Sequence, residues 1–308
     1  MRFTAKIRLL ICFIFITVGS IGFSGTKNES QSKSPANSQN DLHLVIDKTE
    51  REFCIQTVQE VVRAPNRERL KAFCDEIKRL PSCLSIEKKP IHHSESISNN
   101  PNGKRILVLG MIHGDEPLAG EMALEWAERL KKISGARNSW RVVPLLNPDG
   151  FQRKTRGNAN GVDLNRNFPT KDWEEAALDY WRKRAKSDPR RYPGESAASE
   201  PETRCAIAHI KDFKPDFVVS IHTPYRVLDF DGPKMAFPKY GELPWRALGN
   251  FPGSLGRYMW RDYKIPVLTI ELGDKMVNHA LLQDVIGGFA IEAVKRSGKK
   301  EPTIFETM

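Results

Sequence analysis

The chain has 308 residues, 40% of them hydrophobic, which is enough to bury the core of one large α/β domain with a smaller attachment. Its formal net charge of +10 comes from Lys and Arg residues spread along the sequence, without the aromatic stripe found in nucleic-acid binders. We therefore expect no nucleic-acid partner, and the charge suits solubility, an anionic envelope surface or an acidic ligand.

Residues 1–24 have the pattern of a secretory signal peptide. Three cations and no acid flank an apolar run from Leu9 to Phe23, and the small residue Ser24 is placed for cleavage. Removal of this segment would leave +7 of the formal charge. We expect a periplasmic or secreted protein with no stable membrane insertion after cleavage. An uncleaved anchor is the alternative, because the run is only a little too short to span a bilayer.

Two further segments precede the main body of the chain. Residues 25–41 are polar and predict a flexible leader. Residues 42–85 predict a helical N-terminal extension, because two amphipathic stretches occur between Leu42 and Pro81 and could form a hairpin. The role of this extension is left open.

Four cysteines lie outside the signal segment. Cys54, Cys74 and Cys83 cluster in the extension, and export favours a disulfide among them, with the connectivity left open. Cys205 lies in an apolar helical run and is expected to be a buried thiol.

Short apolar runs bounded by turn residues predict four strands buried on both faces. They are Arg105–Ile112, Trp140–Leu146, Phe217–Ile221 and Pro266–Leu272. Helical patterns cover Glu116–Lys132, Ser199–Phe213 and Leu281–Arg296. In the second of these, Ser199 and Glu202 have the spacing of a capping box. Strands alternating with helices predict an α/β fold over residues 86–300, with a mixed, largely parallel sheet and helices on both faces.

Polar residues follow or end three of the predicted strands. His113 follows the first strand, His222 follows the third and Glu271 lies near the end of the fourth, where sites of such sheets collect. His113 and Glu116, three residues apart, could reach one ion, and His222 would complete a catalytic zinc set with an open fourth position. On its own, the His-x-x-Glu pair is more often the start of a helix with a solvated acid than part of a metal site. The remaining histidines lack this context, and we expect His92, His93 and His209 at the surface.

Further motifs follow in a fixed order. They are Asn147-Pro-Asp-Gly150, Arg153-Lys-Thr-Arg156, Gly161-Val-Asp-Leu-Asn165-Arg166-Asn167-Phe-Pro169 and Pro215-Asp216-Phe-Val-Val-Ser-Ile-His222. With the histidines, this combination resembles the zinc carboxypeptidase family that includes carboxypeptidases A and B, from about Arg105 to Ile291. The resemblance implies that residues 86–300 form a catalytic domain of that kind.

The resemblance also implies roles for individual residues. His113, Glu116 and His222 match the ligands of one Zn²⁺ per chain, and Glu271 matches the catalytic glutamate. Arg153 matches the arginine that stabilises the oxyanion, and Asn165 and Arg166 match the pair that grips the terminal carboxylate of the substrate. Ligand histidines need an acceptor for their second ring nitrogen, and Asp149 and Asp163 are the candidates.

Within that family, four stretches are similar to the murein peptide amidases. They are HGDE at 113–116, NANGVDLNRNFP at 158–169, GESAASEPET at 194–203 and FPGSLGRY at 251–258. The similarity implies that peptidoglycan peptides are the substrates and that the bond cleaved joins γ-D-glutamate to meso-diaminopimelate. It implies nothing about oligomeric state.

One departure from the family concerns a tyrosine. Where digestive carboxypeptidases carry a tyrosine at the catalytic site, residues 245–251 read WRALGNF, and Tyr240 or Tyr258 could substitute from a loop. The Gly- and Pro-rich segment Asp231–Phe251 is expected to be a lid and specificity loop.

Two alternatives compete with this interpretation. An amino-acid deacylase of the succinylglutamate desuccinylase type would share the metal triad, but is not expected to carry the NPDG and SEPET stretches together. A non-catalytic wall-binding relative would be expected to have lost a ligand or the base, whereas all four residues are present.

Overall fold

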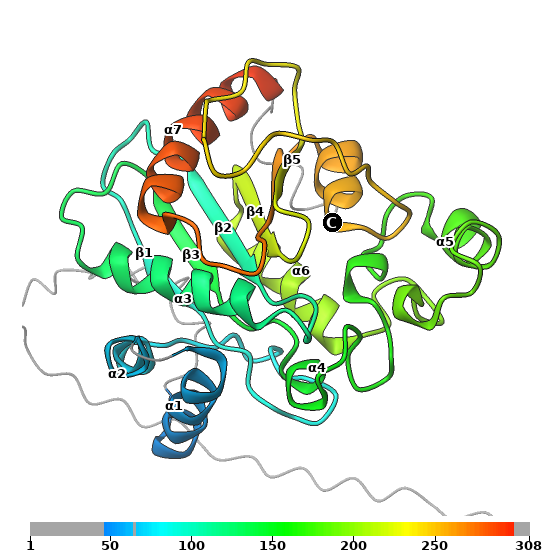
Figure 1. Cartoon of the computed structure of the whole chain (residues 1–308), viewed down its shortest axis with the longest axis horizontal. Helices are drawn as coiled ribbons and strands as arrows, with labels where there is room; N and C mark the ends of the chain where they lie inside the picture. Colours follow the sequence, from blue (N-terminus) through cyan, green and yellow to red (C-terminus); the bar gives the residue numbers. More distant parts are fainter. Residues whose placement is uncertain (1–45, 64–65, 299–308) are drawn as a thin grey trace, which may run out of the picture. The chain divides into compact units, whose positions relative to one another are not determined.

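The structure, a computed structural model, describes residues 46–63 and 66–298 (Figure 1). The predicted signal segment and leader, residues 1–24 and 25–41, lie outside the described residues. None of the helices in the described part is both long and apolar enough to cross a bilayer.

A six-stranded sheet forms the centre of the fold, with the strand order β1-β3-β2-β4-β6-β5. The strands are β1 (Ser94–Ser96), β2 (Arg105–Gly110), β3 (Ser139–Val143), β4 (Phe217–His222), β5 (Val227–Asp231) and β6 (Val267–Glu271). The inner four, which are those predicted, pair in parallel, and the edge strands β1 and β5 pair antiparallel to their neighbours. The prediction of a mixed, largely parallel sheet is confirmed.

Helices cover both faces of the sheet (Figure 1). Alternate residues of each central strand enter two separate cores: Ile106 and Val108 of β2 pack with the helices α3 and α7, and Leu107 packs with α6. The α-helices are α1 (Lys48–Val61), α2 (Arg67–Leu70), α3 (Pro117–Lys131), α4 (Pro148–Arg153), α5 (Trp173–Lys183), α6 (Pro201–Phe213) and α7 (His279–Ser297). Short 3₁₀ turns η1 (Lys71–Asp75), η2 (Leu164–Arg166) and η3 (Pro189–Arg191) and a π-helical segment η4 (Arg257–Asp262) complete the list.

The start of α6 differs from the prediction in its cap. Pro201 is the first helical residue, but Ser199 makes no capping bond to the helix. Its hydroxyl donates to Glu200 at 2.6 Å instead and accepts a bond of 3.0 Å from the side-chain amide of Asn167.

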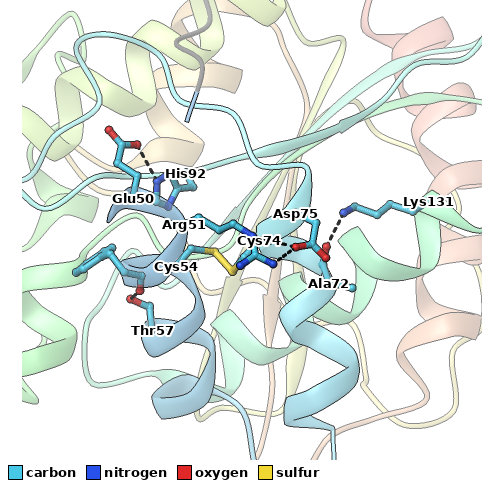
Figure 2. The surroundings of a disulfide bond; sticks show 10 residues. Glu50, Arg51, Cys54, Thr57, Ala72, Cys74, Asp75, His92 and Lys131 are labelled. Atoms are coloured by element: carbon cyan, nitrogen blue, oxygen red, sulfur yellow. Dashed lines mark hydrogen bonds and ion pairs between the residues drawn. A yellow bond between two sulfur atoms is a disulfide. The ribbon is translucent and has the colours of Figure 1, made fainter. Parts of the chain in front are cut away.

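In the described part of the extension, α1 contacts the short α2 and η1, and a disulfide links α1 to η1. The helical pattern expected as far as Pro81 ends at Asp75, and Lys78 and Leu84 form isolated bridges to His93 and Pro90. Cys54 of α1 bonds to Cys74 of η1, which confirms a disulfide within the predicted cluster (Figure 2). Around it, Arg51 pairs with Asp75, and Lys131 of α3 donates to the Ala72 carbonyl at 3.0 Å. Such a cross-link of a loop of about 20 residues contributes ~3 kcal/mol in the chain-entropy account.

The second disulfide corrects a prediction, because Cys205 is not a free thiol. It bonds to Cys83, and both residues are fully buried between the extension and α6.

The expectation of surface histidines is also wrong. His93 and His209 have no exposed surface, and their rings meet edge to face with centroids 4.8 Å apart. His92 is 8% exposed, and its Nε2 lies 3.2 Å from a Glu50 carboxylate oxygen (Figure 2). The extension packs over these rings, and a single sequence gives no sign of that long-range contact.

Candidate metal centre and active site

Three of the predicted site residues meet where the inner parallel strands end, at their carboxyl termini. β4 ends at His222 and β6 ends at Glu271, and the two residues are register partners in adjacent parallel strands. His113 lies just beyond the end of β2, the other neighbour of β4. Because parallel strands end at the same edge of a sheet, sequence positions more than a hundred residues apart converge there.

The ring nitrogens and a carboxylate converge on one point. Nδ1 of His113 lies 2.9 Å from Glu116 Oε1, and Nδ1 of His222 lies 3.0 Å from Glu116 Oε2. The two Nδ1 atoms are 3.1 Å apart. All three residues are buried, and their donor atoms lie within 4.8 Å of one another. Two imidazoles and one carboxylate in this arrangement suit a catalytic zinc with an open position.

The outer nitrogens of both rings have partners that orient them. His113 Nε2 lies 3.0 Å from Asp163 Oδ1, and His222 Nε2 lies 2.8 Å from the Ser220 hydroxyl. A proton on each Nε2 leaves both Nδ1 lone pairs facing inward, as ligation requires. Of the two acceptors expected from the sequence, Asp163 therefore has this contact. Asp149 does not: it accepts bonds from Ser85 and Lys89.

A cavity of about 710 Å³ opens over this cluster and includes Glu271 in its lining. Glu271 is 7% exposed, and its Oε2 accepts a long bond of 3.4 Å from the backbone N–H of Tyr225. Burial raises the pKa of Glu271. A carboxylate of raised pKa beside a group of candidate metal ligands has the properties of a general base.

Asn165 and Arg166 both line the same cavity, from the turn η2. The Cζ atom of Arg166 lies 4.5 Å from the centroid of the Phe251 ring. Its Nε is buried without a hydrogen-bond partner among the described residues. Gly253, at a φ of 78°, lies so close to the Arg166 carbonyl that a side chain there would overlap it. A guanidinium that is held in place and still has unused N–H donors can bind a carboxylate with a bidentate pair of hydrogen bonds.

Arg153 does not line the cavity. Its guanidinium is half exposed and pairs with Glu87 at the surface. Arg156, three residues later, lines the cavity instead, with its Nε 3.1 Å from Asp163 and its Nη1 3.5 Å from Glu116. Although burial opposes ionisation, Arg156 and His113 hold the pKa of Asp163 well below its usual range.

Neither tyrosine considered from the sequence lines the cavity. Tyr258 is buried against Phe168, and burial raises its pKa above that of an ordinary tyrosine, while the Tyr240 hydroxyl contacts Glu242. Tyr225 is the tyrosine in the lining, and it is 64% exposed. It follows His222 by three residues and precedes both tyrosines, Tyr240 and Tyr258, that the sequence offered as substitutes.

The predicted loop Asp231–Phe251 contributes both of its ends to the cavity. The middle of the loop packs outside the cavity. The rings of Phe237 and Trp245 stack with their centroids 4.4 Å apart, and the centroid of Trp245 lies 5.3 Å from that of Phe289 in α7. The loop therefore forms a wall of the cavity while its centre is anchored on the core.

Comparison with known proteins agrees with this geometry. A family model described as zinc carboxypeptidase matches residues 70–231. Murein peptide amidase A of Escherichia coli K12 is 33% identical over 165 residues, which is 53% of this chain and 59% of that protein. The Vibrio campbellii protein of that name is 31% identical over 193 residues, 59% of this chain and 73% of the relative. The match thus spans less than two thirds of the E. coli protein.

Solved structures share the fold. A crystal structure of thrombin activatable fibrinolysis inhibitor has a TM-score of 0.55 at 16% identity, covering 79% of this chain and 80% of that one. The bovine inhibitor in complex with tick carboxypeptidase inhibitor has a TM-score of 0.52 at 17% identity, with 84% and 97% covered. At such identities the likeness concerns the fold alone.

Proposed function

Because the chain belongs to the zinc carboxypeptidase family, we propose that it is a zinc-dependent hydrolase that removes the C-terminal residue of murein peptides. The observation that carries this proposal is the convergence of two imidazoles, one carboxylate and a separate buried glutamate in one cavity. The two relatives named murein peptide amidase A favour cell-wall peptides as the substrate class.

In this proposal His113, Glu116 and His222 would hold one zinc ion per chain. A zinc ion bound there supplies a Lewis acid, which acidifies water and polarises a carbonyl. Asp163 and Ser220 keep the two rings oriented with their Nδ1 atoms inward. The chain's own contribution would thus be a buried set of three donors, with both rings held by hydrogen bonds.

Glu271 is assigned the proton transfers. It takes a proton from the attacking water and delivers it to the leaving nitrogen as the C–N bond breaks, so that an amide becomes an acid and an amine. Burial raises the pKa of Glu271 toward neutral pH. A carboxyl group with such a pKa can both accept and donate a proton during the reaction.

Two arginines are assigned to the charges of the substrate. Arg156, rather than Arg153, is placed to offset the negative charge that develops on the carbonyl oxygen, because it lines the cavity beside Glu116. Arg166, with Asn165, would bind the terminal carboxylate. An enzyme with such a clamp trims chain ends and does not cut within a chain.

The proposed bond is that between γ-D-glutamate and meso-diaminopimelate, and the proposed location is periplasmic or secreted. The two disulfides favour an oxidising compartment, where stem peptides of the wall are found.

The test is digestion of defined peptides with mass analysis of the products. L-Ala-γ-D-Glu-meso-diaminopimelate should lose its last residue, with kcat/KM well above that of the C-terminal amide and of the D-Ala-extended tetrapeptide. Arg166→Ala should narrow this preference, and Glu271→Gln should reduce turnover by a factor on the order of 10² or more. Equal hydrolysis of all three peptides would favour an endopeptidase or a deacylase.

A further inference from the structure

The edge strand β5 places two carboxylates in the wall of the cavity. Asp229 and Asp231 are two residues apart in an extended strand, so their side chains point to the same face. Both line the cavity, and Asp229 is the register partner of Thr269, two residues before Glu271. The proposed mechanism uses neither carboxylate.

Hydrogen bonds hold both carboxylates, but no cation does. Backbone N–H groups of Leu248 and Phe230 donate to Asp229, and the Asn250 amide donates to Asp231 at 2.8 Å. Across residues 46–63 and 66–298, neither carboxylate forms an ion pair with a Lys, Arg or His.

Buried acids elsewhere in the described residues differ in this respect: Glu200 and Glu202, outside the cavity, accept bonds from Asn158 and have no cation partner, whereas others are paired. Glu125 is paired with Arg69 and Asp163 with Arg156. Burial and the neighbouring Asp231 raise the pKa of Asp229 to about 6. Two uncompensated carboxylates in a partly buried wall are costly, and a cation from outside the chain would offset that cost.

The acid pair lies beside the proposed carboxylate clamp. The side chain of Asn165 accepts a bond of 2.9 Å from the backbone N–H of Leu255. The next residue, Gly256, packs so closely against the Asp231 carboxylate that any side chain at this position would displace it. A residue held by its terminal carboxylate at Asn165 would thus have its side chain next to the acid pair.

We propose that Asp229 and Asp231 are specificity-determining residues, which bind a side-chain ammonium group on the C-terminal residue that the enzyme releases. The preferred substrates are then peptides ending in a diamino acid, with a free carboxylate for Arg166 and a second amino group for the acid pair. This inference rests on the proposed function and names the residues that would select the released amino acid. Diaminopimelate meets both requirements, and so does lysine.

The test compares matched peptides that differ in one group. L-Ala-γ-D-Glu carrying C-terminal L-lysine or L-norleucine isolates the ammonium, and the meso-diaminopimelate peptide serves as reference. The wild-type kcat/KM should be higher for lysine than for norleucine by a factor on the order of ten or more, because an analogue without the ammonium leaves the acids unpaired. Equal kcat/KM for the lysine and norleucine peptides would overturn the inference.

Variants locate the effect. Asp229→Asn and Asp231→Asn should each lower the ratio of kcat/KM for the lysine peptide to kcat/KM for the norleucine peptide. Asp284→Asn, the same change at a side chain 60% exposed and outside the cavity, should keep the preference. Retention of the full preference in both cavity variants would contradict the assignment.

The two proposals fail in different ways. Release of lysine and norleucine at equal rates would leave the carboxypeptidase proposal standing and remove the acid pair from it. No release from any of the three peptides would instead contradict the proposed function itself.

Discussion

At the residue scale, strand ends made part of the site predictable. His113, His222 and Glu271 each follow or end an apolar run, and parallel strands bring such positions to one edge whatever their separation in sequence. The spacing of Glu116 adds the third donor of the cluster. These residues could be identified because their position depends on strand order and direction, which the sequence pattern carries.

The choice between Arg153 and Arg156 could not be made in the same way. Both belong to the segment Arg-Lys-Thr-Arg, and nothing in its composition separates them. The difference arises at Lys154, whose left-handed conformation (φ 54°) ends α4 directly after Arg153, so that Arg156 lies outside the helix. Arg153 stays on the outer surface, and Arg156 turns into the cavity. The acceptor Asp163 is a further signal that appears only in three dimensions.

This difference leads to a paired prediction. Arg156→Ala should reduce kcat/KM on the murein tripeptide by a factor on the order of 10², the usual effect of removing one donor to a developing oxyanion. Arg153→Ala should change it by less than about threefold, because its partner Glu87 is exposed as well. Steady-state kinetics, with zinc content measured on each variant, gives the answer. A larger loss in the Arg153 variant would restore the assignment expected from the sequence.

At the scale of elements, most long apolar or amphipathic segments were predictable, but the amphipathic helix α5 (Trp173–Lys183) and the two edge strands were not. The four inner strands and the helices α3, α6 and α7 occur where periodicity placed them. The strands β1 and β5 were missed because neither has the continuous apolar run of the inner strands: β1 reads Ser-Glu-Ser, and acids interrupt β5 at Asp229 and Asp231. Because β5 was missed, Asp231 was assigned to a loop, and Asp229 was not recognised as a residue of the cavity wall.

The extension is attached to α3 by buried ion pairs that its helical pattern did not indicate. Arg69 of α2 contacts Glu125 at 2.5 Å and Glu128 at 2.9 Å, and the two glutamates are 3% and 7% exposed. Arg63 likewise reaches the buried Glu121. The acids of α3 thus face the extension and not water, which is the reverse of what an isolated amphipathic helix would show.

Arg69→Gln should therefore destabilise the protein. We expect a loss of about 2 kcal/mol in the free energy of unfolding, below the value for a fully buried pair because Arg69 is 39% exposed. Lys71→Gln serves as the control, since its partner Glu68 is 81% exposed, and should cost under about 0.5 kcal/mol. Urea denaturation at neutral pH measures both. Equal effects of the two changes would show that the α2 contact does not hold the extension.

At the scale of the whole molecule, the described part of the extension and the rest of the chain share one hydrophobic core. Val58 and Phe73 of the extension belong to the same buried cluster as Met122 of α3 and Val108 of the sheet. The disulfide between Cys83 and Cys205 adds a covalent link between the extension and α6. The domain division at residues 85 and 86 stays a prediction, because periodicity marks where helices lie and not which core they enter.

The account depends above all on the metal. Zinc per chain and turnover of the murein tripeptide should be measured on one preparation before chelation, after chelation and after zinc is added back. Because His113, Glu116 and His222 form a donor set with an open position, we predict about one zinc per chain, loss of both zinc and turnover on chelation, and recovery of both on addition. Full turnover in protein freed of metal would contradict the central claim.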